Sequence, residues 1–303
     1  MNLVVLSRSR SLYSTRRLGL VGIARGHEVR VVDPWRCAVE LDNGRSRVFA
    51  NGAPLPTPDA LVARVGATNS GHALAVLRQI EQDGACCLNR AEPTARAHDK
   101  LRTLQILASR GVPIVPTCLV RAGSDVRDAV ERLGGPPCIV KFSDGALGAG
   151  VMLLDSAASA ASVVEALAAA RRHALLQPFL PHACDERFFV VGRKVVAAMR
   201  RWTAEGEFRA NIHQGARAEG FAPDEARRRL AVEAARALGL EMAGVDVLDS
   251  PDGPRVLEVN ASPGLEGIER ASGRNVAGAL VRFLESAVAA ARETPADAAA
   301  PGA

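Results

Sequence analysis

The sequence predicts a mixed α/β protein (an α+β composite) whose first part is built on a parallel sheet. The composition is that of a globular protein, with 48% hydrophobic and 23% charged residues in a chain of 303. An apolar strand at 3–6, a helical pattern at 12–25 that ends before Gly26, and a second strand at 28–32 follow one another. A strand, a helix and a strand within roughly 30 residues imply parallel pairing. Strand and helix patterns then alternate along most of the chain.

The remaining patterns divide the chain into three predicted domains and a tail. Residues 1–97 carry further strand patterns at 37–41, 46–50, 59–63 and 85–88 and a helical pattern at 71–82. Residues 98–174 carry helical patterns at 99–110, 124–133 and 156–172 and strand patterns at 118–121, 138–142 and 151–154. Residues 175–293 carry strand patterns at 187–191, 194–200, 243–248 and 255–260 and helical patterns at 223–238 and 276–292. The Ala- and Pro-rich tail 294–303 is predicted to be disordered.

Composition excludes several classes of protein. No stretch approaches the ~18 apolar residues of a membrane span, and the apolar start is too short for a signal peptide. The six cysteines form no C-x-x-C pair, so we expect free thiols in the cytoplasm. A net charge of +5 fits anionic small molecules or an acidic protein partner better than nucleic acid. The arginine run 227–229 is expected to be the solvated face of a helix.

Lysine is unusually scarce. Only Lys100, Lys141 and Lys194 occur, whereas the other 35 basic residues are arginine. A lysine is a compact point charge that can reach a single phosphate oxygen where the planar guanidinium would not fit. Lys100 and Lys141 are therefore candidates for contacts with phosphate groups, the alternative being that they survive by chance. Lys194 lies beside a predicted hairpin turn and is expected at the surface.

Two carboxylates and an amide converge on a predicted hairpin. The turn signal Pro251-Asp252-Gly253 centres the hairpin on Asp252, which brings Asp246 opposite Glu258. Glu258 and Asn260 are two residues apart on one strand and therefore project to the same face. Such oxygen ligands suit Mg²⁺ with nucleotide phosphates completing its shell. A solvated hairpin with scattered acids is the alternative, but the flanking Val, Leu and Ala residues favour a half-buried sheet.

A glycine-rich loop follows Lys141. Gly145, Gly148 and Gly150 lie between two predicted strands, which argues against a dinucleotide-binding fingerprint and against a Walker loop. A flap between strands can lay its backbone N–H groups over phosphates. A plain hairpin also needs glycine, so the glycines alone do not distinguish the two interpretations. The lysine that precedes the loop strengthens its interpretation as a phosphate flap.

The order and spacing of these residues resemble the ATP-grasp carboxylate–amine ligases. Four stretches resemble the RimK branch more closely: Leu6-Ser-Arg with Ser11-Leu-Tyr-Ser14, Arg25-Gly-His, Asp99-Lys-Leu-Arg, and the run from Glu258 to Glu269. The resemblance extends from residue 1 to about residue 292. It implies an ATP-grasp fold with an N-terminal parallel-sheet domain, a small central lid domain and a C-terminal domain, and nucleotide bound between the last two.

The resemblance also assigns roles to individual residues. Lys100 and Lys141 would hold the ATP phosphates beneath the glycine flap. Asp185 would bind the ribose, with Arg187 in the same wall. Arg209 and Asn211 would line the reacting centre as catalytic residues. The hinge strand around adenine would comprise Gln177, Pro178, Phe179 and Leu180, and two Mg²⁺ or Mn²⁺ ions would be held by Asp246, Glu258 and Asn260.

The chain departs from the family pattern in three places. Pro178 replaces a glutamate of the hinge, which leaves backbone carbonyls to accept from the adenine amine. Gln214 replaces an arginine that would face an acyl phosphate or a substrate carboxylate. The loop 181–184 is about two residues shorter.

Three functions are compatible with this sequence. The first is ATP-dependent activation of a carboxylate as an acyl phosphate, followed by attack of an amino acid amine with release of ADP and phosphate. By resemblance the amino acid is L-glutamate and the acceptor is a protein or peptide C-terminus, such as that of a small-subunit ribosomal protein. The second is a ligase of the same fold that acts on a small metabolite, and the third is a nucleotide-binding regulatory module without turnover. The resemblance implies a tendency toward homo-oligomers. The mild charge and the lack of long apolar stretches predict no binding of nucleic acid or membrane.

Overall fold

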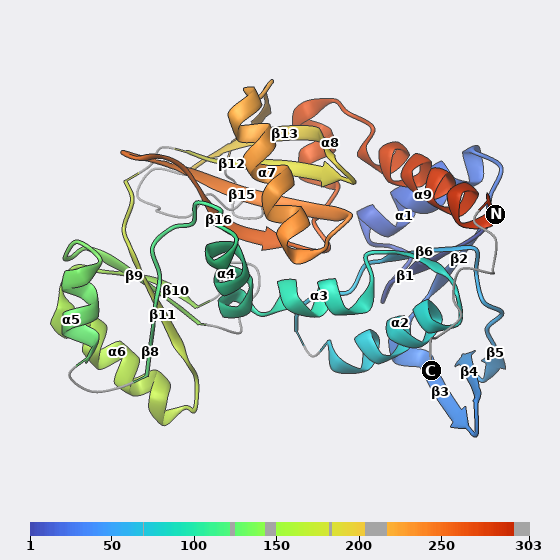
Figure 1. Ribbon diagram of the computed structural model, residues 1–303, viewed down its shortest axis with the longest axis horizontal. Coiled ribbons are helices and arrows are strands. Elements are labelled where there is room, and N and C mark those ends of the chain that lie inside the picture. The colour runs from blue at the N-terminus through green and yellow to red at the C-terminus, as the bar shows by residue number, and fades with distance from the viewer. Residues whose placement is uncertain (69, 122–124, 143–149, 182–183, 204–216, 294–303) are drawn as a thin grey trace, which may run out of the picture. The chain divides into compact units, whose positions relative to one another are not determined.

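The computed structural model describes residues 1–68, 70–121, 125–142, 150–181, 184–203 and 217–293 (Figure 1). The predicted site residues Gly145, Gly148, Arg209 and Asn211 and the tail 294–303 lie outside these ranges. The chain divides into two compact units. Unit 1 comprises residues 1–65, 71–91 and 275–303, and unit 2 comprises residues 66–70 and 92–274.

Unit 1 is built on the predicted parallel sheet, which is confirmed. Its strand order is β2-β1-β6-β7, with β1 (Asn2–Leu6), β2 (Glu28–Val32), β6 (Ala60–Ala63) and β7 (Cys86–Leu88). Three helices pack in this unit: α1 (Tyr13–Ala24), α2 (Gly71–Gln82) and α9 (Val276–Glu293). A short helical turn η1 (Pro34–Arg36) leads to a small antiparallel sheet of β3 (Cys37–Asp42), β4 (Arg45–Ala50) and β5 (Ala53–Pro54).

Helices α1 and α9 lie on one face of the parallel sheet and α2 on the other (Figure 1). A Cβ atom at Gly22 of α1 would lie 2.7 Å from Val29 and 3.3 Å from Leu3, so α1 packs directly on these two strands. Helix α9, which the sequence division placed with the third domain, packs on α1. Its Glu285 accepts two hydrogen bonds from Arg25, at 2.8 and 2.6 Å, at the end of α1.

Unit 2 begins with two helices and a four-stranded antiparallel sheet. The helices are α3 (Ala91–His98) and α4 (Lys100–Ser109), the latter capped by Asp99. The sheet has the order β10-β9-β11-β8, with β8 (Cys118–Val120), β9 (Cys138–Phe142), β10 (Val151–Leu154) and β11 (Ala174–Pro178). Helices α5 (Asp125–Arg132) and α6 (Ala157–Ala169) cover one face and share an apolar core with it.

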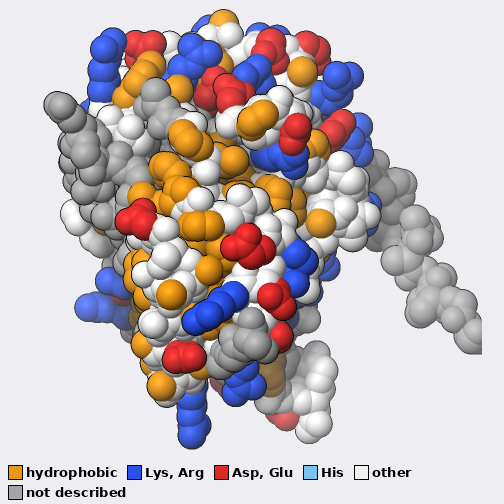
Figure 2. Space-filling model, turned by 90° about the vertical axis from the view of Figure 1, so that its left-hand side faces the viewer, with side chains coloured by type: hydrophobic (Ala, Val, Ile, Leu, Met, Phe, Trp, Pro, Cys, Tyr) orange, Lys and Arg blue, Asp and Glu red, His pale blue; other side chains and the backbone are white. Residues whose placement is uncertain are grey.

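The second sheet of unit 2 is five-stranded and antiparallel. Its order is β14-β13-β12-β15-β16, with β12 (Cys184–Val191), β13 (Lys194–Trp202), β14 (Ala218–Gly220), β15 (Met242–Ser250) and β16 (Gly253–Asn260). Helix α7 (Glu225–Leu238) packs Leu230 and Leu238 against Phe188 and Val245 on one face. Helix α8 (Glu266–Ser272) lies beside β13 and β14. On the face shown in Figure 2, acidic and basic side chains are interspersed around a band of hydrophobic ones.

The structure confirms the mixed α/β class and adds elements that the sequence did not predict. These are η1, β5, α3, β14 and α8, all short. Helix α3 contains Pro93. The ring lies in the first turn, where its missing N–H group leaves no helical hydrogen bond unmade. In the described ranges no helix has the length and apolar character to cross a membrane.

The packing of α1 generates a stability prediction from two glycines on this helix. Gly22→Ala forces a methyl group against Val29 and Leu3, and overpacking of this kind costs about 1–3 kcal/mol. Gly19→Ala meets nothing within 4 Å and gains the helix preference of alanine, about 0.5–1 kcal/mol. In urea denaturation we expect Gly19→Ala to raise the free energy of unfolding and Gly22→Ala to lower it. Equal stabilisation by both substitutions would contradict the packing described here.

Candidate active site

The predicted pairing of Asp246 with Glu258 is confirmed, although the turn is not centred where the sequence placed it. Ser250 pairs with Gly253, so the turn comprises Pro251 and Asp252. The register shifts between Asp246 and Val247, and this β-bulge restores the expected partner of Asp246.

The bulge also decides which face each residue of β16 presents. Val256 and Val259 both belong to the apolar core beside α7, although they are three residues apart. A regular strand would turn such residues to opposite faces. The bulge at Leu257 removes this conflict and leaves Glu258 and Asn260 on the face away from α7.

Asp246 lies in a buried network of charges. Arg187 of β12 donates to both of its oxygens, Nε to Oδ1 and Nη2 to Oδ2, each at 2.6 Å. Arg201 of β13 adds a bond from Nη2 to Oδ2 at 2.9 Å. Burial raises the pKa of Asp246, but the two guanidinium groups outweigh it and hold the pKa at about 2. The carboxylate is therefore ionised at neutral pH, the form that a metal ligand requires.

Arg201 also holds Asp185, the predicted ribose partner. Its Nε and Nη2 atoms donate to the two oxygens of Asp185 at 2.6 and 2.7 Å. Burial raises the pKa of Asp185, an effect that Arg201 opposes and the nearby Asp246 carboxylate adds to. Arg201 was not among the predicted site residues. The Gly192-Arg193 turn by itself predicts a different partner for Asp185. A bulge between Phe189 and Val190 shifts the register, so that Asp185 pairs with Arg201 instead.

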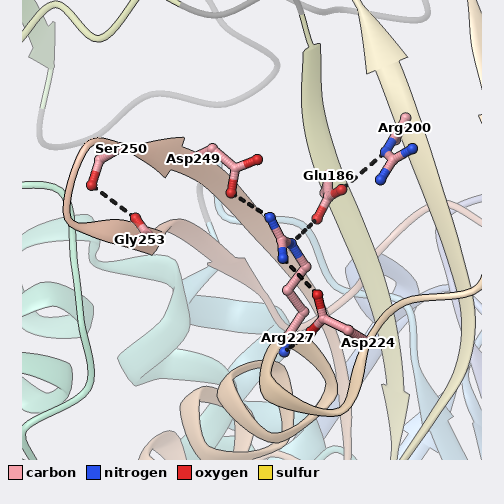
Figure 3. A network of polar contacts seen from close by, with 7 residues as sticks. All are labelled: Glu186, Arg200, Asp224, Arg227, Asp249, Ser250 and Gly253. Carbon is pink, nitrogen blue, oxygen red and sulfur yellow. Dashed lines mark hydrogen bonds and ion pairs between the residues drawn. The ribbon is translucent and has the colours of Figure 1, made fainter.

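The opposite face of the same strands is fixed by Arg227 of α7 (Figure 3). Arg227 donates to Glu186 of β12 at 3.0 Å and to Asp249 of β15 at 2.6 Å. It also bonds Asp224, the N-cap of its own helix, at 2.6 Å. Glu186 receives a further bond from Arg200 at 3.0 Å. Helix α7 is thus tied to both strands that carry Arg187 and Asp246.

A pocket brings together residues that lie far apart in the sequence. Lys100 of α4, Lys141 of β9, Gln177 of β11 and Glu258 of β16 line it. Gln177 is oriented by a hydrogen bond from its Nε2 atom to the hydroxyl of Thr117 at 2.8 Å.

The charges in this pocket act on Lys141. Burial lowers the pKa of its ammonium group to about 8, an effect that Glu258 opposes, the positive charge of Lys100 reinforces and Asp246 opposes. The pKa of Lys141 therefore depends on another lysine and on both predicted acidic metal ligands. An anion bound between the two lysines would offset their repulsion, and the phosphates of a nucleotide have the required charge.

The other predicted nucleotide contacts lie on or near β11 and the glycine loop. Pro178 ends β11, and the backbone of Phe179 bonds the carbonyl of Pro137 at 3.2 Å. Leu180 follows with a partly buried side chain. Gly150 has φ +78°, and a Cβ atom there would overlap the ring of Phe142, so its own conformation requires glycine.

The donor set fits a divalent cation. In the described ranges no group of three or more His, Cys, Asp or Glu side chains could hold a metal ion. The predicted set has two carboxylates, Asp246 and Glu258, and the amide of Asn260. Its Oδ1 atom accepts a hydrogen bond from the Ser262 backbone at 2.9 Å, which fixes the side chain. Glu258 is exposed at the pocket wall. Two carboxylates and an amide oxygen are the hard ligands that Mg²⁺ and Mn²⁺ accept.

Comparison with known proteins supplies the family. Residues 97–284 match the RimK-like ATP-grasp domain, and residues 1–93 match the RimK PreATP-grasp domain. A probable alpha-L-glutamate ligase of Psychromonas ingrahamii is 42% identical over 287 residues, which cover 94% of this chain and 95% of that protein. A protein of the same name from Xanthomonas oryzae pv. oryzae is 45% identical over 290 residues, covering 95% and 98% of the two chains.

Solved structures agree with these matches. The ATP-grasp ligase PsnB complexed with a minimal precursor superposes with a TM-score of 0.75 at 26% identity, covering 94% of this chain and 97% of that one. A PsnB complex with minimal precursor, Mg and ADP superposes with a TM-score of 0.74 at 25% identity, covering 95% and 97%. The chain therefore belongs to the RimK-like ATP-grasp family and is a ligase of the ADP-forming carboxylate–amine class.

Proposed function

We propose that this ligase activates the C-terminal carboxylate of a protein or peptide as an acyl phosphate and joins it to the amine of L-glutamate. The observation that carries the proposal is the convergence of Lys100, Lys141 and Glu258 on one pocket beside the ionised Asp246. The names of the curated relatives support L-glutamate. The peptide-bound PsnB structures support a peptide acceptor, and a small-subunit ribosomal protein is our first candidate. The free thiols of all six cysteines fit a cytoplasmic enzyme.

The residues act by positioning and by neutralising charge. Lys100 and Lys141 offset the phosphate charge of ATP while an acceptor carboxylate oxygen attacks the terminal phosphorus and ADP leaves. The glutamate amine then attacks the acyl carbon, and phosphate departs. Asp246, Glu258 and Asn260 would hold Mg²⁺ or Mn²⁺, which supplies further positive charge at the phosphates when bound. Gln177 to Leu180 would contact adenine and Asp185 the ribose, with Arg187 fixed on Asp246. Arg209 and Asn211 remain the proposed residues at the acyl phosphate.

The deciding experiment separates acceptor classes. Purified protein is incubated with ATP, Mg²⁺ and each amino acid, with and without the candidate ribosomal protein or a peptide of its C-terminus. A gain of glutamate mass on the acceptor, together with ADP, supports the proposal. ADP formed only when a small carboxylic acid replaces the peptide would instead assign a metabolite ligase.

Replacement of the pocket carboxylate tests the metal assignment. Glu258→Gln keeps the size of the side chain but removes its charge, so we expect ADP release to fall by at least ~10²-fold, the scale of losing one key electrostatic contact. Added EDTA should abolish turnover of the unaltered enzyme. Glu165→Gln, at an exposed position of α6, is the matched control and should retain normal turnover. Near-normal activity of Glu258→Gln would overturn the assignment.

Replacement of the pocket lysine tests whether shape matters as well as charge. Lys141→Arg keeps the positive charge but places a larger planar group in a half-buried position, so we expect the KM for ATP to rise about tenfold or more. Lys194→Arg, at an exposed position beside the β12–β13 turn, is the control. Full activity of both variants would show that the scarce lysines have no special role.

A further inference from the structure

One residue of the arginine run on α7 turns inward. The sequence predicts that the run 227–229 forms the solvated face of a helix. Arg228 and Arg229 are exposed, whereas the side chain of Arg227 is only 23% exposed, so the prediction is wrong at this residue. The Nε, Nη1 and Nη2 atoms of Arg227 each donate to a different carboxylate. A guanidinium bound at all three nitrogens is held in one orientation, so it can fix the elements that it bonds relative to one another.

The bonds of Arg227 join α7 to two neighbouring strands along a diagonal (Figure 3). Glu186 of β12 pairs with Val247 of β15. Arg227 bonds Glu186 and also Asp249, which lies two residues beyond this pair on β15. A planar group that holds both carboxylates opposes sliding of one strand along the other. Asp224, the N-cap of α7, accepts from Nη1 at 2.6 Å and fixes the guanidinium to its own helix.

The alignment of β12 with β15 decides the geometry of the candidate metal site. Arg187 and Asp246 are cross-strand partners on these two strands, directly beside the pair that contains Glu186. Each strand is irregular with its other neighbour, since β12 has a bulge with β13 and β15 has one with β16 beside Asp246. A shift of one residue between paired strands moves the side chains of one strand to the opposite face. The diagonal contact therefore protects the two bonds of 2.6 Å between Arg187 and Asp246.

The carboxylate that Arg227 holds on β12 is itself buried. The side chain of Glu186 is 7% exposed and accepts from Arg227 and from Arg200, each at 3.0 Å. A buried carboxylate has lost its water, so these charge-assisted bonds replace its solvation and fix its direction. Glu186 lies between Asp185 and Arg187 in the chain. Its attachment therefore sets the position of the strand segment that carries both of these predicted site residues.

We infer that Arg227 is a positioning residue for the metal site: from the far face of the sheet it holds β12 and β15 in alignment, so that Arg187 keeps the Asp246 carboxylate in place for a metal ion. This inference rests on the proposed function, in which Asp246 holds Mg²⁺ or Mn²⁺. Arg227 is not among the residues that line the nucleotide pocket, so it acts through the strands. Asp185 is held by Arg201 of β13, so the effect concerns the metal rather than the ribose.

The test compares Arg227→Met with its neighbours in the run. ADP is titrated into each protein by calorimetry, once with Mg²⁺ and once with EDTA. In Arg227→Met we expect the Kd of ADP with Mg²⁺ to rise about tenfold, the scale of losing a group that orients a metal ligand, and the Kd in EDTA to change less than about twofold. Arg227→Lys keeps the charge without the fork and should give an intermediate Kd. Arg228→Met and Arg229→Met are the matched controls and should bind like the unaltered protein.

A second comparison separates positioning from a general loss of stability. Leu230→Ala removes an apolar contact of the same helix, so it should lower Tm without changing the effect of Mg²⁺ on ADP binding. An equal loss of that effect in Leu230→Ala would assign the result to loosening of α7 and overturn the inference.

A milder variant serves if Arg227→Met does not fold. Asp249→Asn changes an exposed partner and leaves the bonds of Arg227 to Glu186 and Asp224 in place. We expect the Kd of ADP with Mg²⁺ to rise about threefold in this variant, the scale of one hydrogen bond. An unchanged Kd in Asp249→Asn would contradict the diagonal contact.

Failure of the proposed function has a different signature. If Mg²⁺ does not strengthen the binding of ADP to the unaltered protein, the metal assignment fails. Hydrogen exchange then decides whether Arg227 aligns the strands: the backbone amides of residues 185–188 and 245–248 should exchange about tenfold faster in Arg227→Met than in Arg228→Met. Equal exchange in these two variants, or an unchanged Kd of ADP with Mg²⁺ in a folded Arg227→Met, would overturn the inference.

Discussion

The candidate site depends on the mutual neutralisation of four buried or half-buried charges, Asp185, Arg187, Arg201 and Asp246. Without the two guanidinium groups, burial would raise the pKa of both carboxylates and favour their neutral form. A network of this kind adds little net stability compared with apolar packing. Its effect lies in geometry, because each bidentate pair fixes the direction of an acidic side chain. Arg227 does the same for the strands on their other face.

Local signals were sufficient to predict much of this molecule. The unit of β1, α1 and β2 follows from apolar periodicity and from Gly26, and the residues of the parallel sheet lie close to their predicted ranges. The pairing of Asp246 with Glu258 was predicted from a turn centred on Asp252, and it holds because a bulge offsets the different centre of the observed turn. Lys100 and Lys141 were selected by their scarcity, and the pocket brings them together. These inferences need only neighbours in the sequence or the chemistry of a residue type.

Tertiary contacts account for the features that could not be predicted from the sequence. Two bulges displace the pairings that each turn would set, and one of them concealed the contact of Arg201 with Asp185. Helix α9 belongs to unit 1 because Glu285 meets Arg25, a contact across 260 positions of the chain.

Cationic side chains occur in two kinds of environment in this protein. Around Asp246 every guanidinium has a carboxylate, which suits groups that must hold their geometry through a reaction. At Lys141 burial lowers the pKa and compensation is incomplete, so this cation is less stable in the free protein than it would be with an anion beside it. An anionic ligand that binds only the folded chain recovers this energy, and its binding then stabilises the fold by mass action. The incomplete compensation of Lys141 is what the proposed contact with nucleotide phosphate would relieve.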